Sequence, residues 1–317
     1  MPKNESLQPV ELPMEQKWGK KPTTLLKNNL SAIDVELIAA PTPNELRDYL
    51  PQFLEATWAE DPNDARKLSE REKDELIRNC ILGKSLPTAL ETINLVFKIS
   101  GISIQEATHL IRYRTGSFSA DCSGDKWWTD RAALVPWSIE NSPEFIERYE
   151  QIVKDAKQLY CDMIDSKEVS IMDARYILPR CLETFYFMRM NLKDAIAFIN
   201  QRIDKQIQPE TDNIIAYQMA CNIVAEIPYC YDIFDFHKPS MFYANMARTG
   251  KATNLYFPDE DSDIFEWHPD DFIYQKYRHE MNGTGGGNWN LFKKTFEYYN
   301  KLLYRVNIAA KKYLCVE

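Results

Sequence analysis

The sequence predicts a mixed fold in which short strands alternate with amphipathic helices. Residues 35–40, 92–100 and 183–190 are strand candidates, and in the third of them aromatic and polar side chains roughly alternate. Residues 142–165 carry apolar side chains at helical spacing, after a start of a capping serine, a proline and an acid. With 317 residues and 44% hydrophobic content, the chain can form one large domain or two smaller ones.

The remaining elements follow from local signals along the chain. Residues 1–30 are polar and are expected to form an arm, and the strand at 35–40 stops at Pro41 and Pro43. We expect helices at 44–58, 64–82 (ended by Gly83), 104–111, 192–206 and 209–226, and a short helix at 172–179 ended by Pro179. Gly101 is expected to form the turn between the second strand and the next helix. The last ninety or so residues contain a glycine-rich loop at 283–287 and a closing helix near 290–313.

Composition excludes several classes of function. The net charge of −9 argues against broad contact with nucleic acid or an anionic membrane, and no apolar run reaches membrane length. The N-terminus lacks a signal-peptide core, and seven cysteines without a C-x-x-C pair indicate a reducing cytoplasm. Four scattered histidines predict no metal site, and the glycines at 283–287 lack the Lys-Ser/Thr of a phosphate-binding loop.

The chemistry is expected between His109 and Arg131. Arg112 and Arg114 close a helix and are followed by a loop of small polar residues, a combination that suits an anionic group. The alternative is a solvated surface loop in which the two arginines form ordinary ion pairs. A further alternative is nucleophilic catalysis by Cys122 with His109 as its base.

Four motifs in order resemble those of the flavin-dependent thymidylate synthases. Arg112-Tyr113-Arg114 followed after eight residues by Ser123-Gly124 resembles the family's Arg-His-Arg…Ser signature. Thr88-Ala89-Leu90-Glu91 resembles its Thr-x-x-Glu element, and the run from Asp173 to Pro179 is close to its Asp-Ala-Arg-Tyr-x-Leu-Pro element. Asn200-Gln201-Arg202 matches an Asn-x-Arg flavin contact that follows Asn191. The resemblance covers about residues 83–225.

The resemblance implies a fold, a reaction and a set of site residues. It implies an α+β fold with a central antiparallel sheet packed with helices, forming a homotetramer with FAD at subunit interfaces. The implied reaction transfers a one-carbon group from methylenetetrahydrofolate to carbon 5 of dUMP or a related pyrimidine nucleotide, with NADPH as reductant. By position, the residues implied to bind FAD are Thr88, Glu91, Arg112, Tyr113, Arg114, Asn200 and Arg202. The residues implied to bind the substrate are Asp121, Cys122, Ser123, Gly124, Asp125, Lys126, Lys193 and Asp212. Ser123 and Arg202 are the catalytic candidates. The catalytic domain would then span residues 31–226, followed by an extension at 227–317 of unknown role.

This sequence departs from the family pattern at charged positions. Asp125, Lys193 and Asp212 stand where the family has arginines, Tyr113 replaces a histidine, and Lys84 replaces another. An acid in place of an arginine reverses the local charge and weakens phosphate binding. The missing positive charge could come from Lys126, Arg131, Arg180 or Arg189, and Arg202 could instead pair with Asp204 or Glu210. Alternatively the substrate is not dUMP, because an aspartate beside the ring accepts hydrogen bonds from an amino group and favours cytosine.

Two rival functions stay open at this point. One is a pyrimidine nucleotide hydroxymethylase of the same fold, in which water instead of hydride reacts with the one-carbon intermediate. The other is a non-catalytic relative that acts as a binding protein. A conventional thymidylate synthase needs a Pro-Cys-His nucleophile, and the nearest match here is Pro179-Arg180-Cys181-Leu182.

Overall fold

The fold is organised around a four-stranded sheet. The computed structural model describes residues 22–234, apart from 30–31, 57, 62, 84–85, 141, 203–209 and 231–232. The strands are β2 (Asp34–Ala39), β3 (Asn94–Ser103), β4 (Ser117–Ala120) and β6 (Glu183–Asn191), in the spatial order β2-β3-β6-β4. All three neighbouring pairs are antiparallel, which confirms the predicted α+β fold with its antiparallel sheet.

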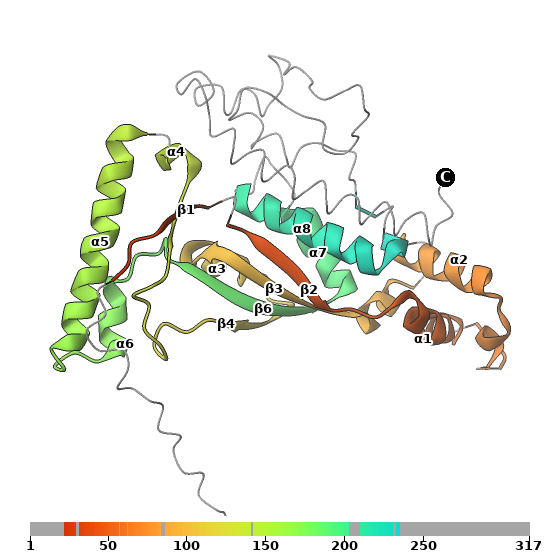
Figure 1. Cartoon of the computed structure of the whole chain (residues 1–317). Helices are drawn as coiled ribbons and strands as arrows, with labels where there is room; N and C mark the ends of the chain where they lie inside the picture. Colours follow the sequence, from red (N-terminus) through yellow and green to blue (C-terminus); the bar gives the residue numbers. More distant parts are fainter. Residues whose placement is uncertain are drawn as a thin grey trace, which may run out of the picture.

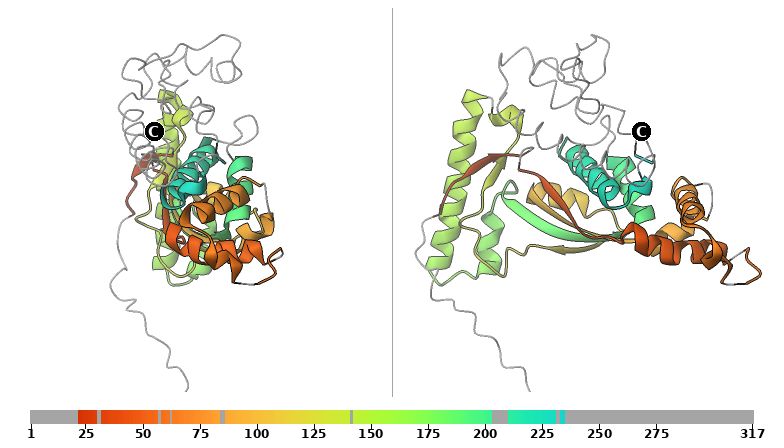
Figure 2. Two further views of the ribbon diagram at one scale, coloured as in Figure 1. Left: turned by 90° about the vertical axis from the view of Figure 1, so that its right-hand side faces the viewer. Right: turned by 45° about the vertical axis from the view of Figure 1, so that its right-hand side comes forward.

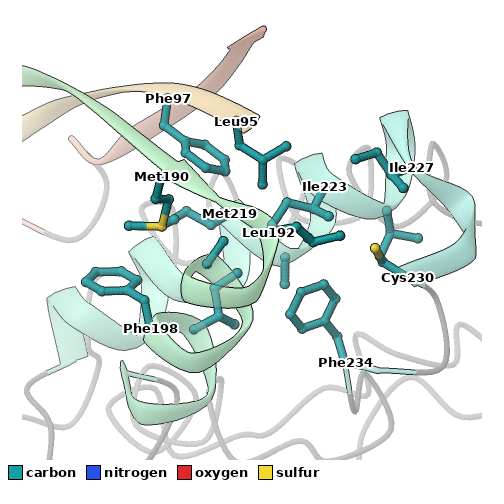
Figure 3. Packing of buried hydrophobic residues seen from close by; sticks show 14 of the residues in the cluster. Leu95, Phe97, Met190, Leu192, Phe198, Met219, Ile223, Ile227, Cys230 and Phe234 are labelled. Carbon is teal, nitrogen blue, oxygen red and sulfur yellow. The ribbon is translucent and has the colours of Figure 1, made fainter. Parts of the chain in front are cut away.

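Helices cover one face of this sheet (Figure 1). They are α3 (Ile104–Leu110), α7 (Leu192–Arg202) and α8 (Glu210–Glu226), as predicted apart from shifts of a few residues at their ends. Alternate strand residues such as Phe97 and Met190 are buried against Leu192 and Phe198 of α7, and Figure 3 shows this packing. Apolar side chains at every second strand position and along one helix face therefore build a single core between the sheet and its helices.

A helical layer lies at one end of the sheet. It contains α1 (Pro43–Glu55), η2 (Asp64–Lys67), α2 (Glu70–Ile81), η3 (Pro87–Thr92) and η5 (Pro228–Cys230). Capping boxes start α1 at Thr42 and α2 at Ser69. Tyr229 donates a hydrogen bond to Asp74 of α2, and Phe234 belongs to the main core. The core thus continues past residue 226, beyond the boundary predicted for the catalytic domain.

A second group of elements lies at the opposite end (Figures 1 and 2). It consists of β1 (Leu26–Asn28), β5 (Ala133–Val135), α4 (Trp137–Glu140), α5 (Pro143–Asp165), α6 (Ile171–Ala174) and η4 (Arg175–Ile177). The strand β1 pairs in parallel with β5, so the last residues of the predicted arm form structure. The buried Lys157 of α5 ties this end together, because its ammonium donates to the carbonyl oxygens of Thr23 and Arg131.

Two local predictions were wrong for reasons of tertiary pairing. Gly101 lies inside β3 instead of forming a turn, with φ of +68° at a bulge between Ile99 and Ile102. Residues 117–120 form the edge strand β4 instead of a loop, because their backbone pairs with β6. The predicted elements at 283–287 and 290–313 lie outside the described residues. Within the described ranges, none of the helices is both long and apolar enough to cross a bilayer.

Candidate active site

The predicted arginine pair lies on the surface at the end of α3. A capping box between Ser103 and Glu106 starts this short helix. Tyr113 turns inward: its ring meets Phe198 of α7 edge-on at 5.1 Å, and its hydroxyl donates to the carbonyl oxygen of Asp194 at 3.3 Å. Because Tyr113 is anchored, the residues on either side of it, Arg112 and Arg114, are exposed. Neither arginine forms an ion pair with another described residue, contrary to the alternative of ordinary surface pairing.

The other predicted flavin residues lie along α7 and the adjacent η3. Asn191 caps α7 by accepting a hydrogen bond from the backbone of Asp194 at 2.8 Å. Two predicted site residues pair with each other, since Lys193 Nζ lies 2.5 Å from Glu91 Oε1 on the surface. Thr88 of η3 and Asn200 near the end of α7 are both exposed. The two elements are in contact, and Tyr113 packs against α7 as well.

A buried polar cluster joins the ends of α7 and α3 to the start of α8. Arg202 Nη1 donates to Asp212 Oδ2 at 2.8 Å, and the Nδ1 atom of His109 lies 3.1 Å from the same oxygen. The Asp212 side chain is fully buried, and that of Arg202 is 7% exposed. Burial raises the pKa of Asp212, and the positive charges at His109 and Arg202 oppose this rise. Asp212 therefore holds its neighbours in place and does not face a substrate as expected, because its own chain occupies its oxygens.

The hydroxyl of Tyr186 lies beside this cluster. It is fully buried and makes no hydrogen bond within the described part of the chain. Burial raises the pKa of Tyr186, and the charge of Asp212 raises it further. The sequence did not single out His109 or Tyr186 as partners of Arg202. The only feature of the sequence that could have placed His109 in this cluster is its position one helical turn before Arg112.

Asp121, predicted to contact the substrate, is instead neutralised within the chain. Its carboxylate is fully buried, with Lys126 Nζ and Arg131 Nη2 each 2.5 Å away. Both cations also lie over the ring of Phe185, at 5.3 and 5.8 Å from its centre. Both cations are thus held by Asp121, and because one carboxylate offsets only one of the two charges, the trio keeps one net positive charge.

A residue that the sequence did not assign supplies a positive charge at the Ser123-Gly124 bend. A Cβ added at Gly124 would collide with the sulfur of Met172 and lie 3.0 Å from Nη1 of Arg175. The guanidinium of Arg175 therefore lies directly beside the backbone at Gly124. Arg175 belongs to the Asp-Ala-Arg-Tyr element that the sequence singled out, but only the fold brings that element to the bend.

The other predicted charge donors bind elsewhere. Arg180 donates to Gln105 Oε1 at 2.9 Å, and Arg189 donates to Asn94 Oδ1 at 2.7 Å. Next to the bend, Asp125 and Cys122 are exposed and Ser123 is half-buried.

The structure does not form the Cys122–His109 pair. The sulfur of Cys122 accepts a hydrogen bond from the backbone of Gly124 at 3.4 Å, whereas His109 contacts Asp212 and Arg202. The described residues also contain no group of three or more His, Cys, Asp or Glu that could hold a metal ion. The site is thus a set of exposed guanidiniums, a glycine bend and a buried Arg–Asp–His cluster, which together suit anionic and polar ring ligands.

Comparison with known proteins identifies relatives of this chain. Residues 44–229 match the family described as "Thymidylate synthase complementing protein". The flavin-dependent thymidylate synthase of Pyrococcus furiosus is 28% identical over 134 residues, which are 41% of this chain and 54% of that protein. The enzyme of the same name from Geobacter sulfurreducens is 29% identical over 127 residues, 39% of this chain and 53% of that protein. The chain thus spans about half the length of the curated relatives it matches.

Solved structures share the fold. The UMP/dUMP methylase PolB from Streptomyces cacaoi, bound with 5-Br dUMP, superposes with a TM-score of 0.56 at 18% identity, covering 66% of this chain and 96% of that one. The same protein bound with 5-Br UMP gives a TM-score of 0.51 at 17% identity, covering 66% and 95%. At such identities the likeness concerns the fold alone. Since the family match extends over well over half of the sequence, the chain belongs to the thymidylate synthase complementing protein family, as a divergent relative of the flavin-dependent thymidylate synthases.

Proposed function

We propose that this chain methylates carbon 5 of a pyrimidine nucleotide, with FAD as cofactor, methylenetetrahydrofolate as one-carbon donor and NADPH as reductant. The observation that carries the proposal is the exposed pair Arg112 and Arg114 beside α7, on either side of the half-buried Tyr113 and left without a described anionic partner. Two relatives are named flavin-dependent thymidylate synthases and a neighbour of the same fold is named a UMP/dUMP methylase, which supports this reaction class.

The residues present fit a flavin dinucleotide. Two neighbouring exposed guanidiniums offer donors for its diphosphate, and the exposed Asn200 of α7 offers an amide for a ring carbonyl. Thr88 and Glu91 of η3 complete this surface, with Glu91 oriented by Lys193. When bound, FAD supplies the hydride chemistry that reduces the transferred one-carbon group.

The nucleotide phosphate is proposed to bind at the Ser123-Gly124 bend. Arg175 provides the charge that the family places two residues after the serine, and Ser123 provides a hydroxyl donor. Two acids, Asp125 and Asp212, had favoured cytosine as the ring of the substrate. Asp212 accepts its hydrogen bond from Arg202, so one of these two arguments for cytosine no longer applies. We therefore propose UMP or dUMP as the substrate.

We further propose that the chain forms a homo-oligomer, a tetramer in keeping with the resemblance. Three large apolar side chains of α5 are exposed at intervals of seven residues and so lie on one side of the helix: Phe145 (52%), Ile152 (64%) and Leu159 (43%). On the sheet face opposite α7 and α8, Ile38 and Phe187 are exposed as well. Exposed apolar surfaces of this kind are typical of protein–protein interfaces, so they support an interface with further copies of the chain.

The test is purification of the full chain, measurement of FAD binding by absorbance, and assay of UMP, dUMP, CMP and dCMP with the folate and NADPH. We expect a flavin spectrum and a methylated uracil nucleotide by mass spectrometry. The double substitution Arg112→Met and Arg114→Met should abolish FAD binding. The matched control Arg66→Met removes an exposed guanidinium from η2 and should leave FAD binding unchanged.

The outcomes separate the rival functions. A product heavier by one oxygen than the methylated nucleotide identifies a hydroxymethylase. A colourless protein that takes up no FAD, yet binds nucleotide, identifies a non-catalytic relative. Conversion of the cytosine nucleotides alone would refute the proposed uracil substrate.

A further inference from the structure

We propose that Lys157 is a positioning residue for the nucleotide site: from inside α5, its ammonium holds the loop of residues 121–131, and with it the Ser123-Gly124 bend, against the N-terminal segment of residues 22–28. This inference rests on the proposed function, because that function places the nucleotide phosphate at the bend. It goes beyond that function by naming what holds the bend in place and by giving the N-terminal segment a part in substrate binding.

A fully buried lysine on the packed face of a helix needs a reason to be there. Lys157 lies one turn from the buried Val153 and Tyr160 on the face of α5 that packs against the rest of the chain. Burial lowers the pKa of Lys157, and the negative charge of Asp130 opposes this shift. Burying an ammonium is costly unless its N–H groups find acceptors. Here two backbone carbonyl oxygens accept hydrogen bonds from it, which offsets that cost.

The two carbonyl oxygens belong to segments that are far apart in the sequence. One is that of Thr23, just before β1, and the other is that of Arg131, at the end of the loop, 2.7 Å from Nζ. The same two segments continue as the parallel strands β1 and β5, and the carbonyl oxygen of Leu25 accepts from the backbone N–H of Ala133 at 2.8 Å. Both strands run beside α5 (Figures 1 and 2). Lys157 therefore joins the two segments where they enter their strands, next to the loop.

The connection continues from Arg131 to the bend. Nη2 of Arg131 lies 2.5 Å from Asp121 Oδ2, and Lys126 Nζ lies 2.5 Å from the other oxygen, Oδ1. Asp121 comes two residues before Ser123-Gly124. Residues 121–131 contain neither a helix nor a strand, so their course depends on side-chain contacts such as these. A displaced Arg131 would move the whole trio of charges, and the bend with it.

Loss of the ammonium should therefore affect one ligand and not the other. Lys157→Met leaves the carbonyl oxygens of Thr23 and Arg131 without this donor, and the loop is then free to leave the N-terminal segment. The proposed flavin residues lie on other elements, at the end of α3 and on η3 and α7. A positioning role predicts weaker nucleotide binding with unchanged FAD binding, whereas a general loss of stability would weaken both.

The first measurement compares the wild type with Lys157→Met in the full-length protein. If the loop keeps its binding arrangement for about a tenth of the time, UMP and dUMP should bind the FAD-loaded variant about tenfold more weakly. FAD titrated into the FAD-free variant should bind as in the wild type. In hydrogen exchange, residues 22–29 and 131–135 should exchange faster in the variant, because β1 and β5 lose the lysine at their common end.

A matched control separates positioning from loss of stability. Leu50→Ala removes buried apolar atoms from α1, at the opposite end of the sheet, and so destabilises the fold without touching the loop. It should leave the affinity for UMP and dUMP unchanged, and its hydrogen exchange should not single out residues 22–29 and 131–135.

A double variant tests whether Lys157 acts through the Arg131–Asp121 contact. Asp121→Asn keeps the shape of the side chain but weakens its hold on Arg131. If both substitutions free the same loop, the loss of nucleotide affinity in Lys157→Met with Asp121→Asn should be smaller than the product of the two single losses. Losses that multiply in full would mean that the two residues act by separate routes, and the proposed connection would be wrong.

The remaining outcomes distinguish this inference from the proposed function. If the wild type binds a uracil nucleotide and Lys157→Met binds it equally well, the inference fails and the proposed function stands. Equal losses of nucleotide and FAD affinity in Lys157→Met would reduce Lys157 to a structural residue and also overturn the inference. If the wild type itself binds no uracil nucleotide, the proposed function fails and this inference fails with it.

Discussion

Replacing Arg202 by methionine should be among the most costly single changes in the domain. Its Nη1 atom lies 2.8 Å from Asp212 Oδ2, and both side chains are almost wholly buried. At an effective dielectric constant of about 20, the attraction at this distance is about 6 kcal/mol, much of which offsets desolvation of the two charges. Without Arg202 the carboxylate stays buried, at a cost of about 3–5 kcal/mol. At pH 7 the buried carboxyl can instead take up a proton, which costs about 4 kcal/mol, so the loss of stability cannot exceed that value. Because burial already raises the pKa of Asp212, taking up the proton costs less and the limit is lower.

The measurement is the free energy of unfolding in urea at pH 7, for Arg202→Met, Asp212→Asn and the double variant. The double variant should be more stable than Arg202→Met, because no uncompensated charge is left in the core. The exposed Arg66 gives the control, since Arg66→Met should change stability by less than about 0.5 kcal/mol. A loss of less than about 1 kcal/mol in Arg202→Met, or a double variant whose loss is the sum of the two single losses, would refute this account of the cluster.

Three other predictions concern separate parts of the molecule. Gly101→Ala should destabilise the domain by at least about 3 kcal/mol in the same urea assay, because φ is +68° and the new Cβ would overlap the carbonyl oxygen of Ala32; wild-type stability would contradict this. Ile152→Glu should shift the chain to smaller assemblies in analytical ultracentrifugation while its monomer stays folded, since it places a charge in the centre of the α5 stripe; an unchanged mass would remove α5 from the interface. Burial lowers the pKa of Lys157, so the unfolded chain holds that proton more tightly than the folded one does. The stability of the wild type relative to Lys157→Met should therefore rise as the pH increases from the lowered pKa towards about 10.4, and a difference in melting temperature that is constant with pH would contradict this.

The sequence could predict what depends on local pattern. Period-two alternation at residues 183–190 predicted β6, and apolar spacing with capping signals predicted α5 and α7 to within a few residues. The order of the four motifs likewise predicted the family, because such motifs are short and contiguous. Patterns of this kind are encoded within a few turns of chain, so one sequence suffices to detect them.

Pairings between distant segments could not be predicted in this way. The edge strand β4 has little strand character of its own and exists because β6 offers its backbone groups. For Arg202 the sequence left two roles open, a contact to FAD and an ion pair with Asp204 or Glu210, and it gave no sign that the return of α8 against α3 brings Asp212 and His109 to it. The same holds for Arg175 at Gly124, where only the packing of α6 determines the contact.

The sequence by itself thus determined the chemical inventory: two arginines around a tyrosine, a serine–glycine pair, and acids where the family has bases. Only the tertiary structure decided which of those charges are exposed and which neutralise each other. The physical reason is that the electrostatic role of a side chain depends on burial and on partners within a few ångströms, and both are set by contacts between segments far apart in the chain.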